Sequence, residues 1–231
     1  MRKYYPFLTL GIFFLFSACQ PYMEDAFLAE KGIINLSSHQ ILDQGACILD
    51  GEWEFYWQEL YSPRDFFRMG QAPPPSYIQV PSSWTLGMNT QGEKHPTYGY
   101  ATYRLQVILP KNHPRLGLFI PKIWSASMIW VNEELVYRAG SVGTSYDFYK
   151  NQIVEELVEL PMSEDKLDII VQVANYDMFI AGLVQSFQVG DYRQMLQAQS
   201  LQYTWVSMWI GVLLAMSLYH FLLFAFRRRR K

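Results

Sequence analysis

Histidine, aspartate and glutamate are common in enzyme sites, but their spacing in this chain forms no such site. The histidines are His39, His95, His113 and His220, which are too scattered for a zinc site. The acidic pairs at 133–134, 155–156 and 164–165 are adjacent residues, whereas a glycosidase needs two carboxyl groups that converge across a cleft. The sequence has no Gly-rich phosphate loop and no nucleophile motif. We therefore expect no catalytic residues, no metal and no cofactor, and a protein that is not an enzyme.

The sequence indicates the environment of three of the histidines. His95 and His113 each precede a proline in a turn, so we expect both to lie in solvated loops. His220 lies in a long apolar segment, where an ionisable group is a candidate for function. A neutral imidazole that packs against neighbouring helices is the alternative for His220.

Aromatic and polar side chains in loops and at strand ends are the candidates for binding a small ligand. Aromatic rings can stack on the apolar face of a sugar, while polar groups fix its hydroxyls. The candidate residues are Trp84, Tyr98, Tyr100, Arg104, Trp124, Asn175 and Tyr176. For each ring, packing in the core or within a loop is the alternative. Arg104 lies on the polar face of a predicted strand, so we expect it to be either exposed or held by a carboxylate.

Short strands separated by turns must position these residues. Trp53, Phe55 and Trp57 alternate with other residues at a period of two, which is typical of a half-buried strand. The clearest strand is residues 100–109. Similar patterns predict strands at 77–80, 116–120, 127–131, 134–137, 167–174 and 183–189, and a helical turn at 61–67. Strands at intervals of about ten residues indicate an all-β sandwich, jelly roll or barrel.

Residues 203–226 form an apolar segment with no charged residue and no proline, followed by a basic tail at 227–231. About 20 apolar residues in a helix span the hydrocarbon core of a bilayer. Tyr203, Trp205 and Trp209 gather at one end, and Lys/Arg excess marks the cytoplasmic side. We therefore predict a transmembrane helix with a cytoplasmic C-terminus. A buried helix of a soluble protein is the alternative.

A juxtamembrane helix is predicted at residues 191–202, directly before this segment. Asp191 can cap it, and no glycine or proline interrupts it before Gly211. One helix could therefore run from the last strand into the membrane and transmit a change in domain position, which a Gly/Ser linker would absorb.

Residues 1–19 have the pattern of an export signal, with Arg2 and Lys3 before a short apolar stretch. The tetrad at 16–19 resembles a bacterial lipobox, although Phe16 replaces the usual leucine, and this resemblance implies lipidation of Cys19. Ordinary cleavage at a nearby small residue and an uncleaved anchor are the alternatives. Residues 20–44 then form a polar tether and a first strand.

The bulk composition limits the partners of the exported part. The whole chain has a net charge of -2, but without the tail cations, Arg2 and Lys3 it keeps 12 basic against 21 acidic residues. This acidic balance argues against nucleic acid as a partner. The only cysteines are Cys19 and Cys47, so a disulfide framework is not expected, and we interpret Cys47 as a small buried hydrophobe.

Six segments, in this order, resemble one family: residues 49–55 (LDGEWEF), 80–84 (VPSSW), 99–105 (GYATYRL), 125–136 (SASMIWVNEELV), 140–145 (GSVGTS) and 167–175 (LDIIVQVAN). Together they look like the galactose-binding-like jelly roll that heads bacterial receptors of the 7TMR-DISM type. Residues 190–226 resemble the junction and first membrane helix of those receptors. One departure is Glu133 after Asn132, where the family has an Asn-Gly turn. The other is that the chain stops at Lys231, after one membrane helix of seven, as in a truncated receptor, a split gene product or a one-helix protein.

The resemblance implies a jelly-roll or galactose-binding-like β-sandwich at residues 45–190, followed by one transmembrane helix. It predicts a membrane-anchored, extracytoplasmic sensory domain in a bacterial cell membrane. The expected partners are the membrane, a carbohydrate or other small ligand, and other receptor subunits, but no nucleic acid. One alternative is an envelope lipoprotein that acts as a protein-interaction module. Another is a sugar-binding fragment of a glycoside hydrolase, since the same jelly roll heads family 2-type hydrolases.

Overall fold

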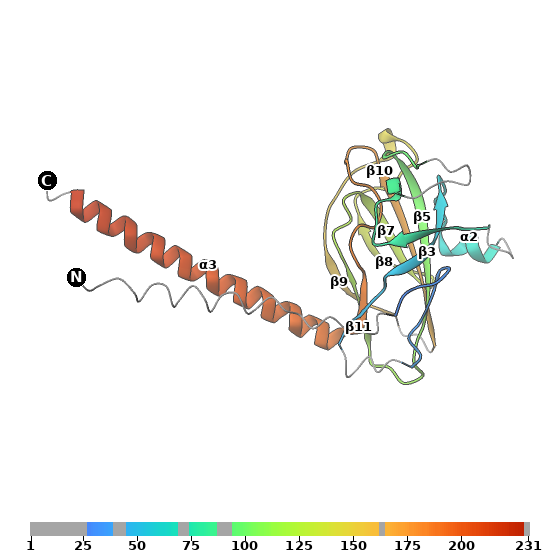
Figure 1. Cartoon of the computed structure of the whole chain (residues 1–231), viewed down its shortest axis with the longest axis horizontal. Helices are drawn as coiled ribbons and strands as arrows, with labels where there is room; N and C mark the ends of the chain where they lie inside the picture. The colour runs from blue at the N-terminus through green and yellow to red at the C-terminus, as the bar shows by residue number, and fades with distance from the viewer. Residues whose placement is uncertain (1–26, 39–44, 69–73, 87–93, 162–164, 229–231) are drawn as a thin grey trace, which may run out of the picture.

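The computed structural model of the chain describes residues 27–38, 45–68, 74–86, 94–161 and 165–228. It shows a β-sandwich from which one long helix projects (Figure 1). The predicted export signal with Cys19, parts of the predicted tether, His39 and the end of the basic tail lie outside the described residues. The expectations about them therefore stay predictions.

The larger sheet has seven strands, six of which follow one path across it. Their order is β4 (Ser76–Val80), β3 (Gly51–Trp57), β5 (Gly99–Ile108), β10 (Lys166–Asn175), β7 (Ala126–Val131) and β8 (Glu134–Ala139). Neighbours along this path are antiparallel. The short strand β1 (Ile33–Asn35) pairs in parallel with the end of β5, beyond the last residue that β3 covers.

The smaller sheet lies against the larger one and has four strands. Their order is β2 (Cys47–Ile48), β11 (Gln188–Asp191), β6 (Leu116–Ile120) and β9 (Glu156–Glu159). The strands pair antiparallel, with Val189 of β11 opposite both Cys47 and Leu118. Short helices fill the connections: α2 (Pro63–Arg68), η2 (Trp84–Leu86) and η3 (Tyr146–Phe148).

The hydrophobic core lies between the two sheets. It consists of apolar side chains at every second position of the strands. Tyr103, Leu105 and Val107 of β5 are fully buried, whereas Arg104 and Gln106 between them face the outer surface. Apolar residues at alternate positions of β10, β6 and β11 join the same cluster. Burial of these side chains contributes about 1.5–3 kcal/mol each. Cys47 also belongs to this core, as predicted, and burial raises the pKa of its thiol to about 11.

Most of the predicted strands are confirmed, and the differences occur in short or irregular segments. The sequence did not predict β9, and it placed the last strand at 183–189, whereas β11 begins only at Gln188. Leu183 and Phe187 are buried there in an irregular segment whose carbonyls accept hydrogen bonds from Ser82 and Leu49. Buried loop residues of this kind have the same apolar pattern as a strand.

The expectation that His95 lies in a solvated loop is wrong. Only 7% of His95 is exposed, and its ring centroid lies 5.3 Å from that of Phe55 and 4.7 Å from that of Trp57. An uncharged imidazole can pack against aromatic rings as a small planar side chain. A histidine that precedes a proline in a turn can therefore still be buried. Burial lowers the pKa of His95.

The long helix α3 (Tyr192–Arg228) begins directly after β11 (Figure 1). The Asp191 carboxylate accepts a hydrogen bond from the backbone N–H of Gln194 at 2.9 Å, which confirms the predicted cap. At 1.5 Å per residue the helix is about 55 Å long. It is the one helix among the described residues that is long and apolar enough to span a membrane. The predicted fold, a β-sandwich followed by one long apolar helix, is thus confirmed.

Candidate functional site

Loops from four strands meet at one end of the larger sheet. β5 and β7 begin there and β10 ends there, since Gly99 pairs with Asn175 and Ala126 with Ala174. β8, antiparallel to β7, also ends there. We call the connecting segments the distal loops; they comprise residues 94–98, 124–125, 140–151 and 176–182.

The distal loops lie at the opposite end of the sandwich from the start of α3 (Figure 1). β5 runs from the distal end to Ile108, and the turn after it leads to Arg115. The carbonyl of Arg115 accepts a hydrogen bond from the backbone N–H of Tyr192, the first residue of α3. A ligand at the distal loops would therefore be a full strand length away from the helix.

Asn175 ties two of the distal loops together and is fully buried. Its amide nitrogen donates hydrogen bonds to the carbonyls of Thr97 at 3.0 Å and Met178 at 2.8 Å. Its amide oxygen accepts one from the backbone N–H of Met178 at 3.0 Å. Asn175 was a candidate ligand contact, but in this structure it positions the loops and does not reach the surface.

Tyr149, Tyr176 and Asp177 form the centre of the distal loops. The Tyr149 hydroxyl donates a hydrogen bond to Asp177 Oδ1 at 2.6 Å, and the two tyrosine rings meet edge to face with centroids 5.5 Å apart. Burial and the Asp177 carboxylate together raise the pKa of Tyr149. Burial and the nearby Tyr100 raise the pKa of Tyr176. Both phenols therefore stay protonated at neutral pH and can act as hydrogen-bond donors.

Four aromatic rings on the distal loops are exposed to solvent. The exposed fractions are 56% for Tyr98, 67% for Tyr146, 74% for Phe148 and 79% for Phe179. A single exposed ring needs no explanation, but four at one end of a domain are typical of a surface that contacts another molecule.

The structure brings together five of the seven residues that the sequence analysis chose. Tyr98, Tyr100, Trp124, Asn175 and Tyr176 all lie at the distal end, on its loops or within two residues of the end of a strand. Tyr98 is exposed, whereas Tyr100, Trp124 and Tyr176 are half-buried.

Trp84 and Arg104 have other roles. Trp84 is fully buried, its indole N–H donates to the carbonyl of Pro96 at 2.9 Å, and its ring packs edge-on against Trp57. It is a core residue without a free ring face. Arg104 lies in the middle of β5, on the outer face of the larger sheet and away from the distal loops.

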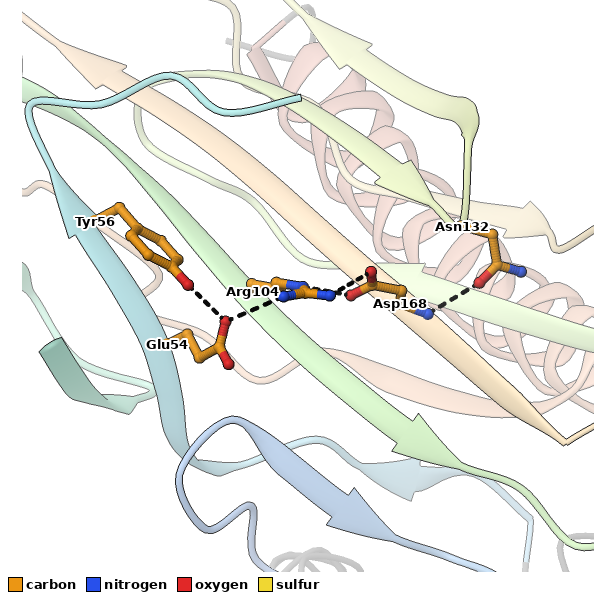
Figure 2. A network of polar contacts seen from close by, with 5 residues as sticks. All are labelled: Glu54, Tyr56, Arg104, Asn132 and Asp168. Carbon is orange, nitrogen blue, oxygen red and sulfur yellow. Dashed lines mark hydrogen bonds and ion pairs between the residues drawn. The ribbon is translucent and has the colours of Figure 1, made fainter. Parts of the chain in front are cut away.

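Arg104 is held by carboxylates, which is one of the two predicted arrangements. Its Nε and Nη2 donate to the two oxygens of Asp168 at 2.8 and 2.9 Å, and its Nη1 lies 3.6 Å from Glu54 Oε2 (Figure 2). The hydroxyl of Tyr56 donates to the same Glu54 oxygen at 2.8 Å. Burial raises the pKa of Glu54, although Tyr56 and Arg104 oppose this rise.

These polar contacts join three strands and a hairpin turn. Glu54, Arg104 and Asp168 lie on β3, β5 and β10, and the backbone N–H of Asp168 donates to the side chain of Asn132 between β7 and β8. Only 13% of the Arg104 side chain is exposed, and its guanidinium lies over the Phe66 ring of α2, 4.5 Å from the centroid. Both carboxylates bind Arg104, so the cluster stabilises the sheet and does not resemble an acid/base pair.

A concave surface lies between α3 and the outer face of the smaller sheet. This groove has a volume of about 580 Å³. Its lining includes Phe119, Leu157 and Gln188 from the sheet and Gln194, Ala198 and Gln202 from α3. α3 therefore contacts the smaller sheet at its first turn and is separated from it further along. No group of three His, Cys, Asp or Glu residues in the described part of the chain could hold a metal ion.

Sequence reasoning missed the residues of the loop at 140–151 and most of those after Tyr176. Tyr149 and Asp177 are 28 positions apart, and neither lies in a periodic segment. The available signal was local: a stretch rich in Gly and Ser carries three aromatic residues, Tyr146, Phe148 and Tyr149, for which no strand or helix pattern accounts.

Comparison with known proteins gives no family for this chain. No protein-family model matches it, and no curated protein is similar to it. Among solved structures, the Ruminococcus gnavus β-glucuronidase matches 62% of the chain at 16% identity with a TM-score of 0.43. The same enzyme in complex with D-glucuronic acid gives the same three values. The match spans only 28% and 29% of those enzyme chains, and at this identity it concerns the fold alone.

Proposed function

We propose that this protein is a membrane-anchored, extracytoplasmic sensing domain, similar to the input module of bacterial receptors of the 7TMR-DISM type. In this proposal α3 crosses the cell membrane with its C-terminal end in the cytoplasm. Export through residues 1–19, with lipidation of Cys19, places the sandwich outside. The distal loops bind a carbohydrate-like ligand, and α3 passes the change in the sandwich to the membrane and to other receptor subunits.

The observation that carries the proposal is the direct continuation of β11 into α3. Gly190 and Asp191 still pair with β6, and the helix starts at the next residue. The 11 residues from Tyr192 to Gln202 make about 16 Å of helix before the apolar segment begins. A helix keeps its direction over this length, so a displacement of the smaller sheet moves the top of the membrane segment.

Close packing at the junction supports a stiff connection. A Cβ atom at Gly117 of β6 would lie only 2.9 Å from the Tyr192 ring and 3.2 Å from Leu157. One at Gly190 would lie 2.9 Å from the backbone of Ala46. Glycine at 117 lets the first turn of α3 lie directly on the smaller sheet, and glycine at 190 lets β11 lie close to Ala46.

The distal loops suit a sugar because they combine exposed rings with fixed polar groups. Tyr98, Phe148 and Phe179 offer rings for stacking, and Asp177, whose Oδ1 accepts a hydrogen bond from the Tyr149 hydroxyl, offers an acceptor that is held in place. Sugar sites in proteins use this combination of apolar surface and a few placed polar groups. The loops are tied together by Asn175, which reduces the entropy lost on binding.

The test is ligand titration of the full chain in detergent micelles, with thermal unfolding as the readout. A panel of neutral hexoses, amino sugars and uronic acids is added at millimolar concentration. We expect at least one sugar to raise the melting temperature, and the double change Phe148→Ala with Phe179→Ala to abolish the rise. Tyr77→Ala is the matched control, because Tyr77 is an exposed ring on β4 outside the distal loops. The absence of a shift with every sugar would reject carbohydrate sensing.

A role as a protein-interaction module is the second candidate, and the high exposure of Phe148 and Phe179 favours it. In that case the same double change would abolish capture of an envelope protein, while no sugar would change the melting temperature. The double change Phe148→Ala with Phe179→Ala therefore distinguishes the two candidate functions, when both the melting temperature with sugars and the capture of an envelope protein are measured.

A further inference from the structure

Asp177 is an accessible carboxylate of the distal loops, next to their paired tyrosine rings. It follows Tyr176 directly and is exposed to solvent. Tyr149 donates to its Oδ1 at 2.6 Å, and Asn151 Nδ2 donates to the same oxygen at 3.4 Å. Among the described residues, no donor is bonded to Oδ2. One oxygen therefore fixes the carboxylate in place, and the other is open to a ligand.

The rings beside Asp177 define where a ligand would lie. Tyr149 and Tyr176 are half-buried and in edge-to-face contact, so they form one wall next to the carboxylate. Phe179, two residues further along, is 79% exposed. A sugar ring that stacks on this aromatic surface would bring its edge groups to Asp177 Oδ2. A carboxylate at this position accepts hydrogen bonds and donates none.

Resting on the carbohydrate-binding function proposed above, we propose that Asp177 selects the ligand: the distal loops bind neutral and amino sugars, whose hydroxyl or ammonium groups donate hydrogen bonds, and exclude uronic acids. A uronate would place a second carboxylate against Asp177, where the two like charges repel and neither can donate. A hydroxyl supplies the missing donor, and an ammonium group also gains from the opposite charge.

Other charges on the distal loops do not cancel this effect. Lys94, Asp147 and Lys150 are the remaining charged residues of these segments. In the described structure none of them forms an ion pair with Asp177. Exposed charges beyond contact distance are weakened by solvent and salt, so the carboxylate that touches the ligand dominates.

The experiment compares glucose, glucosamine and glucuronate as ligands of the full chain in detergent micelles at pH 7. We expect glucuronate to bind at least about tenfold more weakly than glucose, which corresponds to about 1.4 kcal/mol. Glucosamine is expected to bind at least as well as glucose. Asp177→Asn should reduce the difference between glucose and glucuronate to less than about threefold, because the amide keeps the shape and removes the charge.

Asp147→Asn is the matched control variant. It removes another exposed carboxylate of the distal loops and keeps Asp177, so it should keep the preference for glucose over glucuronate. An undiminished difference between glucose and glucuronate in Asp177→Asn would overturn the role of Asp177 and leave carbohydrate binding intact. Failure of all three sugars, and of the wider panel above, would overturn the carbohydrate function itself.

Discussion

Arg104 shows how a single polar residue on a sheet face can determine local stability. Its bidentate pair with Asp168 is largely shielded from solvent, and charge-assisted hydrogen bonds of this kind are worth more than neutral ones. We expect Asp168→Ala to lower the free energy of unfolding by about 2 kcal/mol, since it leaves the guanidinium half-satisfied. Chemical unfolding of the full chain in detergent, followed by circular dichroism of the β signal, measures the change.

The exposed pair Arg115–Glu159 is the control for this prediction. Its N–O distance is 3.0 Å, similar to that of the Arg104 pair, but 66% and 43% of the two side chains are exposed. Solvent screening reduces such a pair to below about 1 kcal/mol, so Glu159→Ala should have little effect. An equal decrease in the free energy of unfolding in Asp168→Ala and Glu159→Ala would show that burial of the Arg104 pair has no energetic consequence.

His95 gives the sandwich a pH dependence whose sign follows from burial. Burial lowers the pKa of His95 in the folded state below the ordinary value of about 6.5, so the unfolded state binds more protons. The contribution of His95 to stability is complete above pH 6.5, falls as the pH drops from 6.5 toward the folded pKa, and is constant below it. We expect the melting temperature of the native chain to fall more steeply between pH 7 and pH 5 than that of His95→Phe.

The phenylalanine variant suits this comparison because the site is lined by Phe55 and Trp57 and accepts an apolar ring. Only the difference between the two pH curves is used, so carboxyl groups that titrate in both proteins cancel. Parallel curves would mean that His95 is protonated as readily in the folded state as in the unfolded state.

At the level of elements, the period of two predicted the strands of five residues or more, and it failed for β2 and β9. β5 and β10 have ten residues each, with a buried residue at every second position, so the two-residue pattern repeats several times in each strand. β1 and β2 have three and two residues, and β9 has four with both ends exposed. A pattern this short has no period, and such strands exist because a longer neighbour supplies the hydrogen bonds.

The third prediction concerns the junction between β6 and α3. Gly117→Leu would force the Tyr192 ring away from the smaller sheet, because even its Cβ would lie 2.9 Å from that ring. Spin labels at Tyr77 and Gln197, both exposed, report the position of the sandwich relative to the helix. We expect the distance distribution between them to shift or broaden in Gly117→Leu.

Gly211→Leu is the control, since apart from the neighbouring backbone of α3 no atom lies within 4 Å of the position of its Cβ. It should leave the distance distribution unchanged. An unchanged distribution in Gly117→Leu would show that the first turn of α3 does not depend on the smaller sheet for its direction.

For the molecule as a whole, the sequence predicted the architecture and part of the candidate site. Strand ends locate Tyr98, Asn175 and Tyr176, because antiparallel neighbours bring alternate ends together. The contact of Tyr149 with Asp177 was not predictable, because it depends on how two irregular loops fold over the end of the sheet. For Trp84 the structure shows the alternative of core packing, because the aromatic residue of a turn can face inward and only packing decides its direction.

The placement of α3 in a bilayer is the last prediction, and tryptophan fluorescence can test it. Trp205 and Trp209 are half exposed on α3, whereas Trp53 and Trp84 are fully buried in the sandwich. In vesicles with brominated lipids, the fluorescence of Trp205 and Trp209 should be quenched most strongly by bromine near the headgroups, where tryptophan concentrates.

The double change Trp205→Phe with Trp209→Phe separates the two groups of tryptophans, because the remaining signal comes mainly from the sandwich. That signal should be insensitive to brominated lipid, since the smaller sheet is held about 16 Å above the apolar segment by the first turns of α3. Quenching that persists in the double variant would place the sandwich in the bilayer surface. Native protein that is not quenched would place α3 outside the membrane, and both results would remove the basis for transmission along the helix.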